Sequence, residues 1–185
     1  MQAGDFRGGS IFKMDGNFYQ VVEYQHIQQP RLAPFVRAKI RNMETGAQQE
    51  KRFNVGDRFP DVRLTRREMQ FLFNEDKVYH FMDAETFDQI PVDEGMVSDA
   101  MQYNVDGITF TFTYADEKLI GVTAPTFVVM AIVECPPAVA GDTARSALKN
   151  ATLESGMVVK VPMFVNQGDK VKIDTRTGTY VERAN

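Results

Sequence analysis

The sequence predicts an all-β protein made of three small β-barrels. Strand-like segments, in which apolar and polar residues alternate with a period of two, recur along the whole chain. Gly, Asn, Asp and Pro residues separate these segments at short intervals, as turns require. Almost no segment shows apolar residues recurring every 3.6 residues over the length of a long helix. We therefore predict three domains, at residues 1–64, 65–126 and 127–185.

The first predicted domain contains four strand-like segments. Asp15-Gly16 is a strong signal for a two-residue hairpin turn between the first two of them. Four or five strands within about sixty residues favour a small, half-open barrel. The predicted strands cover residues 11–14, 17–25, 35–43 and 48–53.

The third of these strands alternates between apolar and basic residues, which a strand sends to opposite faces of its sheet. The core-facing residues are Val36, Ala38 and Ile40. The outward residues, called the basic stripe below, are Arg37, Lys39 and Arg41. The stripe predicts contact with RNA phosphates, and the alternative is a charged face that is merely solvated.

Seven residues, 28–34, join the second and third strands and form what we call the tip loop. Pro30 and Pro34 bracket Arg31; neither proline can donate to a sheet, and each favours an extended residue before it. Arg31 is therefore predicted at the tip of a stiffened loop that carries it to a phosphate-rich partner. The remaining tip residues of this prediction are Gln29, Leu32 and Ala33. An ordinary surface hairpin with one arginine is the alternative.

The second and third domains are each predicted to be five-stranded barrels. Residues 108–114 alternate large apolar side chains with Thr, which indicates a strand with one buried face. Such a set of five strands suggests a small closed barrel such as an OB-fold. The predicted strands of the second domain lie near residues 69–73, 77–82, 87–92, 108–114 and 118–122. Those of the third lie at residues 127–134, 157–161, 163–165, 171–174 and 179–182.

A long polar connection is predicted at residues 136–150, between the first two strands of the third domain. Connections of this length are uncommon inside compact domains and are often functional. The prediction leaves two readings open, a functional loop or a tolerated surface loop.

The composition limits the class of protein. The chain has 185 residues, enough for a sizeable core, and a single cysteine, Cys135, which excludes an internal disulfide framework and fits a reducing cytoplasm. Residues 1–10 lack the apolar segment of a secretory signal, and the longest apolar run, residues 127–133, is too short to span a bilayer. We therefore expect a cytoplasmic protein that does not contact membranes.

The net charge of −4 is unevenly distributed. Residues 1–64 hold ten Lys and Arg against seven Asp and Glu, a net charge of +3. Residues 65–126 hold four against twelve, or −8, and residues 127–185 hold seven against six, or +1. This distribution predicts that phosphate contacts, if made, involve the two outer domains.

The sequence offers little for catalysis. His26 and His80 are far apart in the sequence and have no clustered partners for zinc, and Cys135 stands alone. No phosphate-cradling glycine loop and no nucleophile elbow is present. We therefore predict no enzymatic activity, no catalytic residue, no metal and no cofactor.

The whole chain resembles the bacterial elongation factor P family. The resemblance runs essentially from end to end and is strongest in the last domain. The motifs that carry it are AGDFR at 3–7, DGNFYQV at 15–21, FVRAK at 35–39, FMD at 81–83, ETFDQ at 85–89, GDT at 141–143, ATLESG at 151–156, KVPMFVN at 160–166 and DTRTGTY at 174–180.

The resemblance implies a KOW/SH3-like domain followed by two OB-folds, in an L-shaped arrangement with the outline of tRNA. It implies a monomer that binds the 70S ribosome between the peptidyl and exit tRNA sites and promotes peptide-bond formation at consecutive prolines. The tip loop would reach the acceptor end of the prolyl peptidyl-tRNA. Gly141, Asp142 and Thr143 would lie toward the small subunit and the exit-site codon, and Tyr180 and Arg183 on the domain that faces the tRNA.

The tip loop departs from the usual family pattern. The family sequence Pro-Gly-Lys-Gly is replaced by residues 29–32, Gln-Pro-Arg-Leu, so both glycines are absent and Arg31 stands in the lysine position. The resemblance leaves open whether a modifying enzyme attaches rhamnose to Arg31 or the residue stays unmodified. The alternatives to a ribosome-bound factor are a stand-alone RNA-binding OB-fold protein and a sugar- or metal-dependent enzyme.

Overall fold

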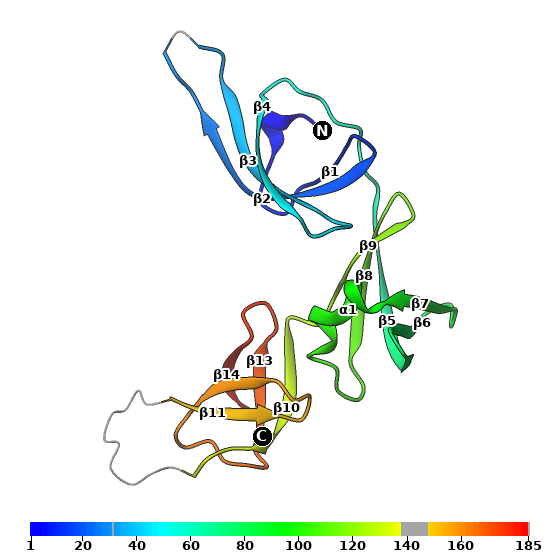
Figure 1. Ribbon diagram of the computed structural model, residues 1–185, viewed down its shortest axis with the longest axis vertical. Helices are drawn as coiled ribbons and strands as arrows, with labels where there is room; N and C mark the ends of the chain where they lie inside the picture. Colours follow the sequence, from blue (N-terminus) through cyan, green and yellow to red (C-terminus); the bar gives the residue numbers. More distant parts are fainter. Residues whose placement is uncertain (31, 138–147, 185) are drawn as a thin grey trace. The chain divides into compact units, whose positions relative to one another are not determined.

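The computed structural model describes residues 1–30, 32–137 and 148–184. Within them the chain forms fourteen β-strands, one α-helix and one 3₁₀-helix, and the strands make three sheets (Figure 1). The all-β prediction is confirmed. The chain divides into two compact units, Met1–Arg66 with Thr113–Gly121, and Arg67–Phe112 with Val122–Asn185. The three-domain division at residues 64 and 126 and the L-shaped arrangement stay predictions.

The first sheet has the order β1-β2-β3-β4. Its strands are β1 (Ile11–Met14), β2 (Asn17–Ile27), β3 (Phe35–Asn42) and β4 (Gln48–Asn54). Asp15 and Gly16 both have positive φ, 50° and 82°, between the paired residues Met14 and Asn17. The predicted two-residue hairpin turn is therefore confirmed, and its chemistry is that of a type I′ turn.

Aromatic rings fill the barrel that this sheet forms with the 3₁₀-helix η1 (Ala3–Asp5). Phe6 lies at its centre, fully buried, with ring centroids 4.8 Å from Phe12, 5.3 Å from Phe53 and 5.6 Å from Phe59. The predicted core-facing residues of β3 are also buried, at 0% exposure for Val36 and Ile40 and 1% for Ala38. The alternation along β3 thus faces the way the sequence predicts.

A hairpin from later in the sequence completes the first unit. It is the turn between β8 (Thr109–Ala115) and β9 (Lys118–Thr123). Ala115 and Ile120 are buried against Phe18, and Ile11, Met43 and Val62 pack around them. At the edge of this cluster, the Lys118 ammonium lies 2.9 Å from a Glu44 carboxylate oxygen.

The second sheet has the order β7-β6-β5-β8-β9. Its remaining strands are β5 (Leu64–Glu75), β6 (Val78–Asp83) and β7 (Gln89–Asp93). Phe81 is fully buried and contacts Phe110 and Phe112 edge-on, with ring centroids 5.6 and 4.9 Å apart. The inward alternation predicted for the strand at residues 108–114 is confirmed at these two phenylalanines.

The helix α1 (Glu94–Met101) was not predicted from the sequence. It is eight residues long, and only Val97 and Ala100 are buried on it. Two apolar positions within one and a half turns are too few to produce a recognisable helical period.

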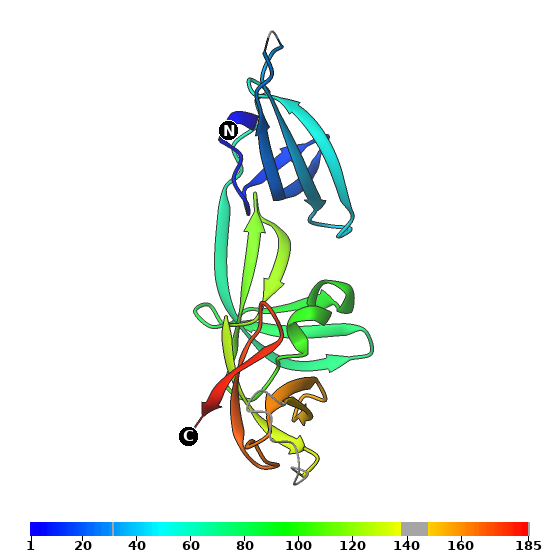
Figure 2. The ribbon, with the colours of Figure 1, turned by 90° about the vertical axis from the view of Figure 1, so that its left-hand side faces the viewer.

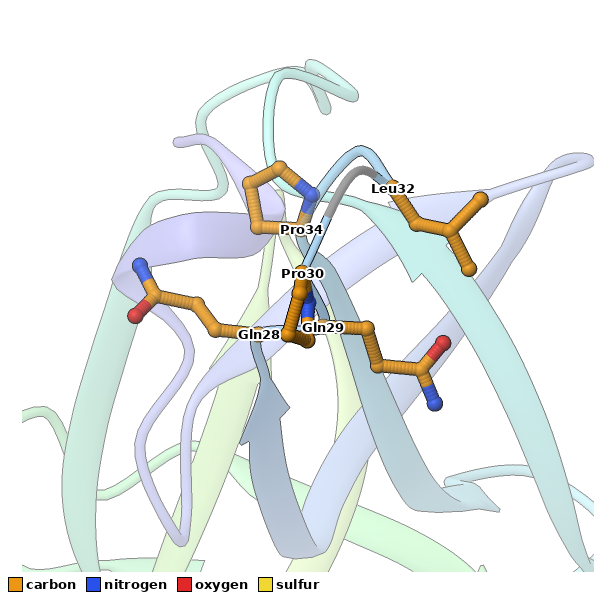
Figure 3. A pocket seen from close by; sticks show the side chains of 5 residues that line it. All are labelled: Gln28, Gln29, Pro30, Leu32 and Pro34. Carbon is orange, nitrogen blue, oxygen red and sulfur yellow. The ribbon is translucent and has the colours of Figure 1, made fainter.

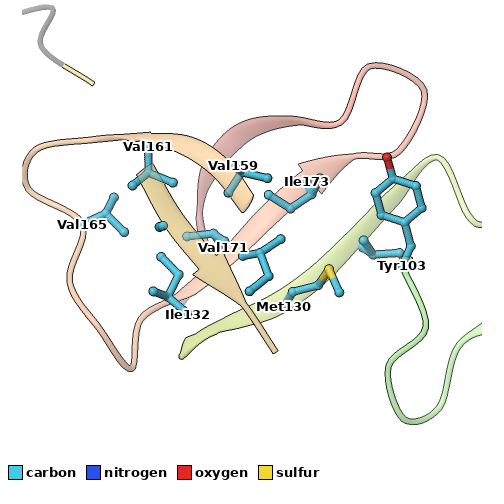
Figure 4. Packing of buried hydrophobic residues seen from close by; sticks show 11 residues of the cluster. Tyr103, Met130, Ile132, Val159, Val161, Val165, Val171 and Ile173 are labelled. Carbon is cyan, nitrogen blue, oxygen red and sulfur yellow. The ribbon is translucent and has the colours of Figure 1, made fainter. Parts of the chain in front are cut away.

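The third sheet has the order β12-β11-β10-β13-β14. Its core is mostly aliphatic, with Met130, Ile132, Val161, Val171 and Ile173 converging between the strands, and Tyr103 is buried in the same cluster (Figure 4). The strands are β10 (Phe127–Glu134), β11 (Leu148–Leu153), β12 (Val158–Pro162), β13 (Lys170–Asp174) and β14 (Thr179–Ala184).

Two predictions about this sheet are wrong. Strand β11 begins at Leu148, inside the predicted connection 136–150. The sequence did not indicate this strand because only two of its residues, Ala151 and Leu153, are buried and the others are mostly polar. The predicted strand at residues 163–165 is a turn, in which the Val165 N–H donates to the Pro162 carbonyl at 3.1 Å. Val165 is nevertheless fully buried, so its apolar character reflects the core rather than a strand.

The same five-residue turn occurs once in each sheet, and we call these the Asx turns. They cover residues 42–46 after β3, 83–87 after β6 and 174–178 after β13. In each, the side-chain oxygen of the first residue, Asn or Asp, accepts the N–H of the third, at 2.8, 2.8 and 2.9 Å. The N–H of the fifth residue donates to the carbonyl of the first, at 2.9, 3.0 and 2.8 Å, and the fifth residue has positive φ.

Two of the Asx turns carry a carboxylate that makes stability sensitive to acid. N–H groups of Thr86 and Glu85 donate to Asp83 and hold its pKa below the usual 3.8, with Arg67 contributing at 3.6 Å. Hydrogen bonds from the Arg176 guanidinium, one of them 2.6 Å long, lower the pKa of Asp174. A depressed pKa adds stability above the unfolded-state pKa and loses it as the pH falls through the folded one.

We expect Asp174→Asn to reduce the stability of the protein near neutral pH and to flatten its acid dependence. The amide oxygen can accept the same N–H bonds, as Asn42 does in the first Asx turn, but it does not titrate. Unfolding in urea, followed by circular dichroism, should give parent and variant free energies that differ above the unfolded pKa of 3.8 and converge as the pH falls below it, through the folded pKa of Asp174. Parallel curves would show that Asp174 carries no linked proton.

Candidate nucleic-acid interface

The β2–β3 hairpin projects from the rest of its sheet and ends in the tip loop, as Figure 2 shows for the dark blue strands. Ile27 and Phe35 are the last paired residues, so the loop comprises the seven residues 28–34 predicted from the sequence. The Leu32 N–H donates to the Gln29 carbonyl at 3.3 Å and closes a turn with Pro30 in its second position. Proline favours that position because its φ is fixed at a suitable value.

The described residues of the tip loop are all exposed, and Leu32 is 64% exposed. Gln28 and Gln29 extend to opposite sides of the loop, and Leu32 points away from it (Figure 3). A small open pocket is lined by Gln28, Gln29, Pro30, Leu32 and Pro34. Arg31 lies outside the described residues, so its predicted role at the tip stays a prediction.

The basic stripe is exposed along the whole of β3, as predicted, opposite the buried face of the same strand. Arg37 is 52% exposed, and its Nε lies 3.5 Å from a Glu50 carboxylate oxygen that is itself exposed. Such an exposed pair is worth little, about 0–1 kcal/mol, so it leaves Arg37 available to a stronger partner. The alternation confirms where the stripe faces, and its contact with RNA stays a prediction.

Strand pairing modifies the stripe in a way that the sequence did not reveal. Arg52 of β4 is the register partner of Arg37, so the two cations share a face next to the tip loop. Lys39 instead has Glu50 opposite it on β4 and Glu23 opposite it on β2. Two cations are therefore paired at the tip end of the stripe, whereas Glu23 and Glu50, the latter also in contact with Arg37, partly offset the charge at its middle.

Arg52 also stacks on an aromatic ring. Its guanidinium carbon lies 3.8 Å from the ring centroid of Phe35, the first residue of β3, which is only 9% exposed. A cation–π contact of this kind holds the guanidinium in one orientation. Sequence reasoning missed both residues, because only the register of β3 against β4 brings them together.

The opposite face of the hairpin carries a second aromatic and basic group. The Tyr24 and His26 rings meet edge-on with centroids 5.8 Å apart, and the Arg7 guanidinium lies 5.8 Å from the Tyr24 ring centroid. His26, which has no clustered partners for zinc, is close to the tip loop in the sequence. Its register with Val36 places it two residues before that loop begins.

The remaining predicted site residues belong to the third sheet or fall outside the description. Tyr180 and Arg183 both lie on β14. Tyr180 packs partly buried against the aliphatic core, and the Arg183 guanidinium lies 3.8 Å from Asp169. Gly141, Asp142 and Thr143 lie outside the described residues. The roles that the resemblance implies for all five residues stay predictions.

His80 and Cys135, which the sequence analysis considered for catalysis, contact other residues of the fold. His80 stacks on Phe73, with ring centroids 4.4 Å apart, and the Cys135 thiol lies 3.7 Å from the Val165 carbonyl oxygen. In residues 1–30, 32–137 and 148–184, no three His, Cys, Asp or Glu side chains are grouped to hold a metal ion. Neither helix of the described chain has the length and apolarity of a membrane span.

Three family models match successive parts of the chain. They are the elongation factor P KOW-like domain at residues 2–59, the elongation factor P OB domain at residues 64–122 and the elongation factor P C-terminal domain at residues 128–183. Elongation factor P of Pelotomaculum thermopropionicum is 45% identical over 183 residues, which is 99% of each chain. The chain belongs to the elongation factor P family.

Other members of the family match over similar lengths. Elongation factor P of Finegoldia magna is 42% identical over 99% of each chain, and that of Thermoanaerobacter sp. is 44% identical over 98% of each chain. Membership of the elongation factor P family identifies the chain as a translation elongation factor and confirms the resemblance seen in its motifs.

A solved structure supports the fold. Eukaryotic translation initiation factor 5A from Methanococcus jannaschii superimposes with a TM-score of 0.57 at 14% identity, covering 67% of this chain and 91% of that one. At this identity the likeness concerns the fold alone. It agrees with the KOW-like and OB domains that the elongation factor P family models assign to residues 2–122.

Proposed function

We propose that this elongation factor binds the 70S ribosome between the peptidyl and exit tRNA sites and promotes peptide-bond formation at consecutive prolines. The observation that carries the proposal is the projecting β2–β3 hairpin, with an exposed tip loop and two cations, Arg37 and Arg52, beside it. A projecting, positively charged hairpin is suited to lie along the acceptor end of a tRNA, where phosphates are dense.

The protein acts on this view by positioning, not by bond chemistry. Proline is a conformationally restricted donor and acceptor, so a misplaced prolyl peptidyl-tRNA reacts slowly. Holding its end in a near-attack geometry removes part of the entropic barrier. A gain of about 3–4 kcal/mol would accelerate the step by about 10²- to 10³-fold.

The other predicted residues have supporting roles in this proposal. Gly141, Asp142 and Thr143 would contact the small subunit near the exit-site codon, and Tyr180 and Arg183 would lie on the domain facing the tRNA. A modifying enzyme that attaches rhamnose to Arg31 would extend the tip. The protein would act as a monomer in the cytoplasm.

In vitro translation of a message encoding Pro-Pro-Pro, with and without the protein, tests the proposal. Faster synthesis of full-length product from this message, and no change for a matched message with alanines, supports it. Binding to 70S ribosomes carrying prolyl peptidyl-tRNA is compared with binding to free single-stranded RNA. Equal affinity for both, with no effect on translation, would favour a stand-alone RNA-binding protein instead.

Removal of the basic stripe should make ribosome binding less dependent on salt. We expect the triple variant Arg37→Ala, Lys39→Ala, Arg41→Ala to reduce the slope of log K against log salt by about 1–2, since each lost phosphate contact contributes about 0.7–0.9. The contribution of Lys39 should be the smallest, because Glu23 and Glu50 face it. Filter binding across a salt series measures the slope.

A matched control variant removes three positive charges from exposed positions outside the β2–β3 hairpin. Arg58, Arg63 and Arg66 are exposed residues of the first unit outside the hairpin. Their triple alanine variant should keep more of the parent slope than the stripe variant does. An unaltered slope in the stripe variant would mean that the stripe is only a solvated face.

A further inference from the structure

The second Asx turn, residues 83–87, differs from the other two at its fifth position. Gly46 and Gly178 occupy that position in the first and third turns, with φ of 72° and 66°. Phe87 occupies it in the second turn, with φ of 63°. The hydrogen bonds of the three turns are the same, so the phenylalanine is the exception within a shared framework.

The fold offers no reason for a phenyl ring at this position. A residue with a Cβ is disfavoured at positive φ, and a bulky one is a true outlier there. Phe87 is also 67% exposed, more than any other large apolar side chain in the described chain. The ring therefore gains little from burial, while glycine would adopt the same backbone without strain, as it does twice in this molecule.

Strained residues that persist on a surface tend to mark functional sites. An exposed aromatic ring on a firmly hydrogen-bonded turn has the properties of an interface anchor, because a rigid ring loses little conformational entropy when it is buried by a partner. The Asp83 carboxylate fixes this turn through the N–H groups of Glu85 and Thr86, at 2.8 and 3.1 Å.

The charges around Phe87 indicate which kind of partner fits. Glu85 and Asp88 lie two residues before and one residue after Phe87 in the sequence and are exposed, and residues 65–126 carry a net charge of −8. The Arg67 guanidinium lies 3.6 Å from the Asp83 carboxylate and so serves the turn itself. Carboxylates repel RNA phosphates and attract lysine and arginine, which disfavours an RNA partner.

We propose that Phe87 anchors a protein–protein contact, in which its ring enters an apolar pocket on a basic protein and Glu85 and Asp88 pair with the cations around that pocket. The inference rests on the proposed function, since the partner is then a basic protein of the ribosome. The contact is separate from the basic stripe, which carries the opposite charge and belongs to the first sheet.

Three substitutions test the anchor. Phe87→Gly removes the ring and relieves the backbone, so we expect Tm to rise by about 2–4 °C while the affinity for 70S ribosomes falls by about tenfold or more. Phe87→Tyr keeps the ring and should retain most of the affinity. Glu85→Lys should weaken binding to a basic protein, whereas it would strengthen binding to RNA.

Photo-cross-linking identifies the class of partner. Benzoylphenylalanine replaces Phe87, and in a control it replaces Phe73, which is 49% exposed on β5 of the same sheet. We expect position 87 to cross-link to a ribosomal protein, and position 73 to cross-link less. A cross-link from position 87 to ribosomal RNA would overturn the proposal.

The outcomes separate this inference from the proposed function. If the parent protein fails to bind 70S ribosomes, the proposed function falls and the inference falls with it. If the parent binds and Phe87→Gly binds equally well, only the anchor is refuted. A fall in Tm of several degrees for Phe87→Gly would also refute it, because the ring would then have a structural role.

Discussion

Replacing Arg31 with alanine is expected to slow translation through consecutive prolines by about 10- to 100-fold relative to the parent protein, the size expected for one or two charge-assisted hydrogen bonds. Arginine keeps its charge at any working pH and offers a planar fork of donors that suits phosphate and ribose oxygens. We propose that Arg31 is the functional tip, because it stands in the lysine position of the family motif that the sequence resembles. In vitro translation of a Pro-Pro-Pro message measures the effect.

The control for Arg31→Ala is Arg63→Ala, which removes an exposed arginine of the same unit outside the hairpin. It should leave the rate close to that of the parent. If Arg31→Ala supports translation as well as the parent does, the assignment of the tip is wrong, whatever the state of the side chain.

The same assay decides whether modification is needed. Pro30 and Pro34 are expected to stiffen the tip loop, and stiffness lowers the ordering cost of docking. We therefore expect recombinant, unmodified protein to be active. The intact mass of protein from its native host shows whether rhamnose is attached. An inactive unmodified protein beside an active native one would establish that the modification is required.

The largest effect on stability is expected from Phe6→Ala. The ring is fully buried and touches three other aromatic rings, Phe12, Phe53 and Phe59. Its loss should cost about 3–5 kcal/mol, through lost burial and the cavity left behind. That is a large part of the about 5–15 kcal/mol that stabilises a typical protein.

Denaturant unfolding of Phe6→Ala is best followed by circular dichroism, because the chain contains no tryptophan. The comparison is Leu32→Ala in the tip loop, where the side chain is 64% exposed and a change within about 0.5 kcal/mol is expected. A loss below about 1 kcal/mol for Phe6→Ala would mean that the barrel collapses around the missing ring.

The sequence predicted features that depend on local pattern. Asp15-Gly16 specified its hairpin turn, and the alternation along β3 correctly assigned a buried face and the basic stripe. Strand β11 escaped prediction because its buried residues, Ala151 and Leu153, lie among polar ones. The turn at residues 163–165 was mistaken for a strand because Val165 belongs to the core without belonging to a sheet.

Features that depend on register could not be predicted. The pairing of β3 with β4 brings Arg52 over Phe35 and makes Glu50 the register partner of Lys39, and neither arrangement has a local signal in the sequence. Phe87 lies within a motif recognised from the sequence, yet the sequence does not reveal its positive φ. Only the comparison with Gly46 and Gly178 in equivalent turns makes the ring at that position unexpected.

The hairpin that completes the first unit has a consequence for how the protein is made. Phe18 is covered by Ala115 and Ile120, which are synthesised about a hundred residues after it. The nascent N-terminal barrel therefore keeps an apolar face uncovered until residues 113–121 have emerged from the ribosome. A fragment that stops at residue 64 would keep that face exposed permanently and would be prone to self-association. The barrel that carries the tip loop is thus finished only late in the protein's own synthesis.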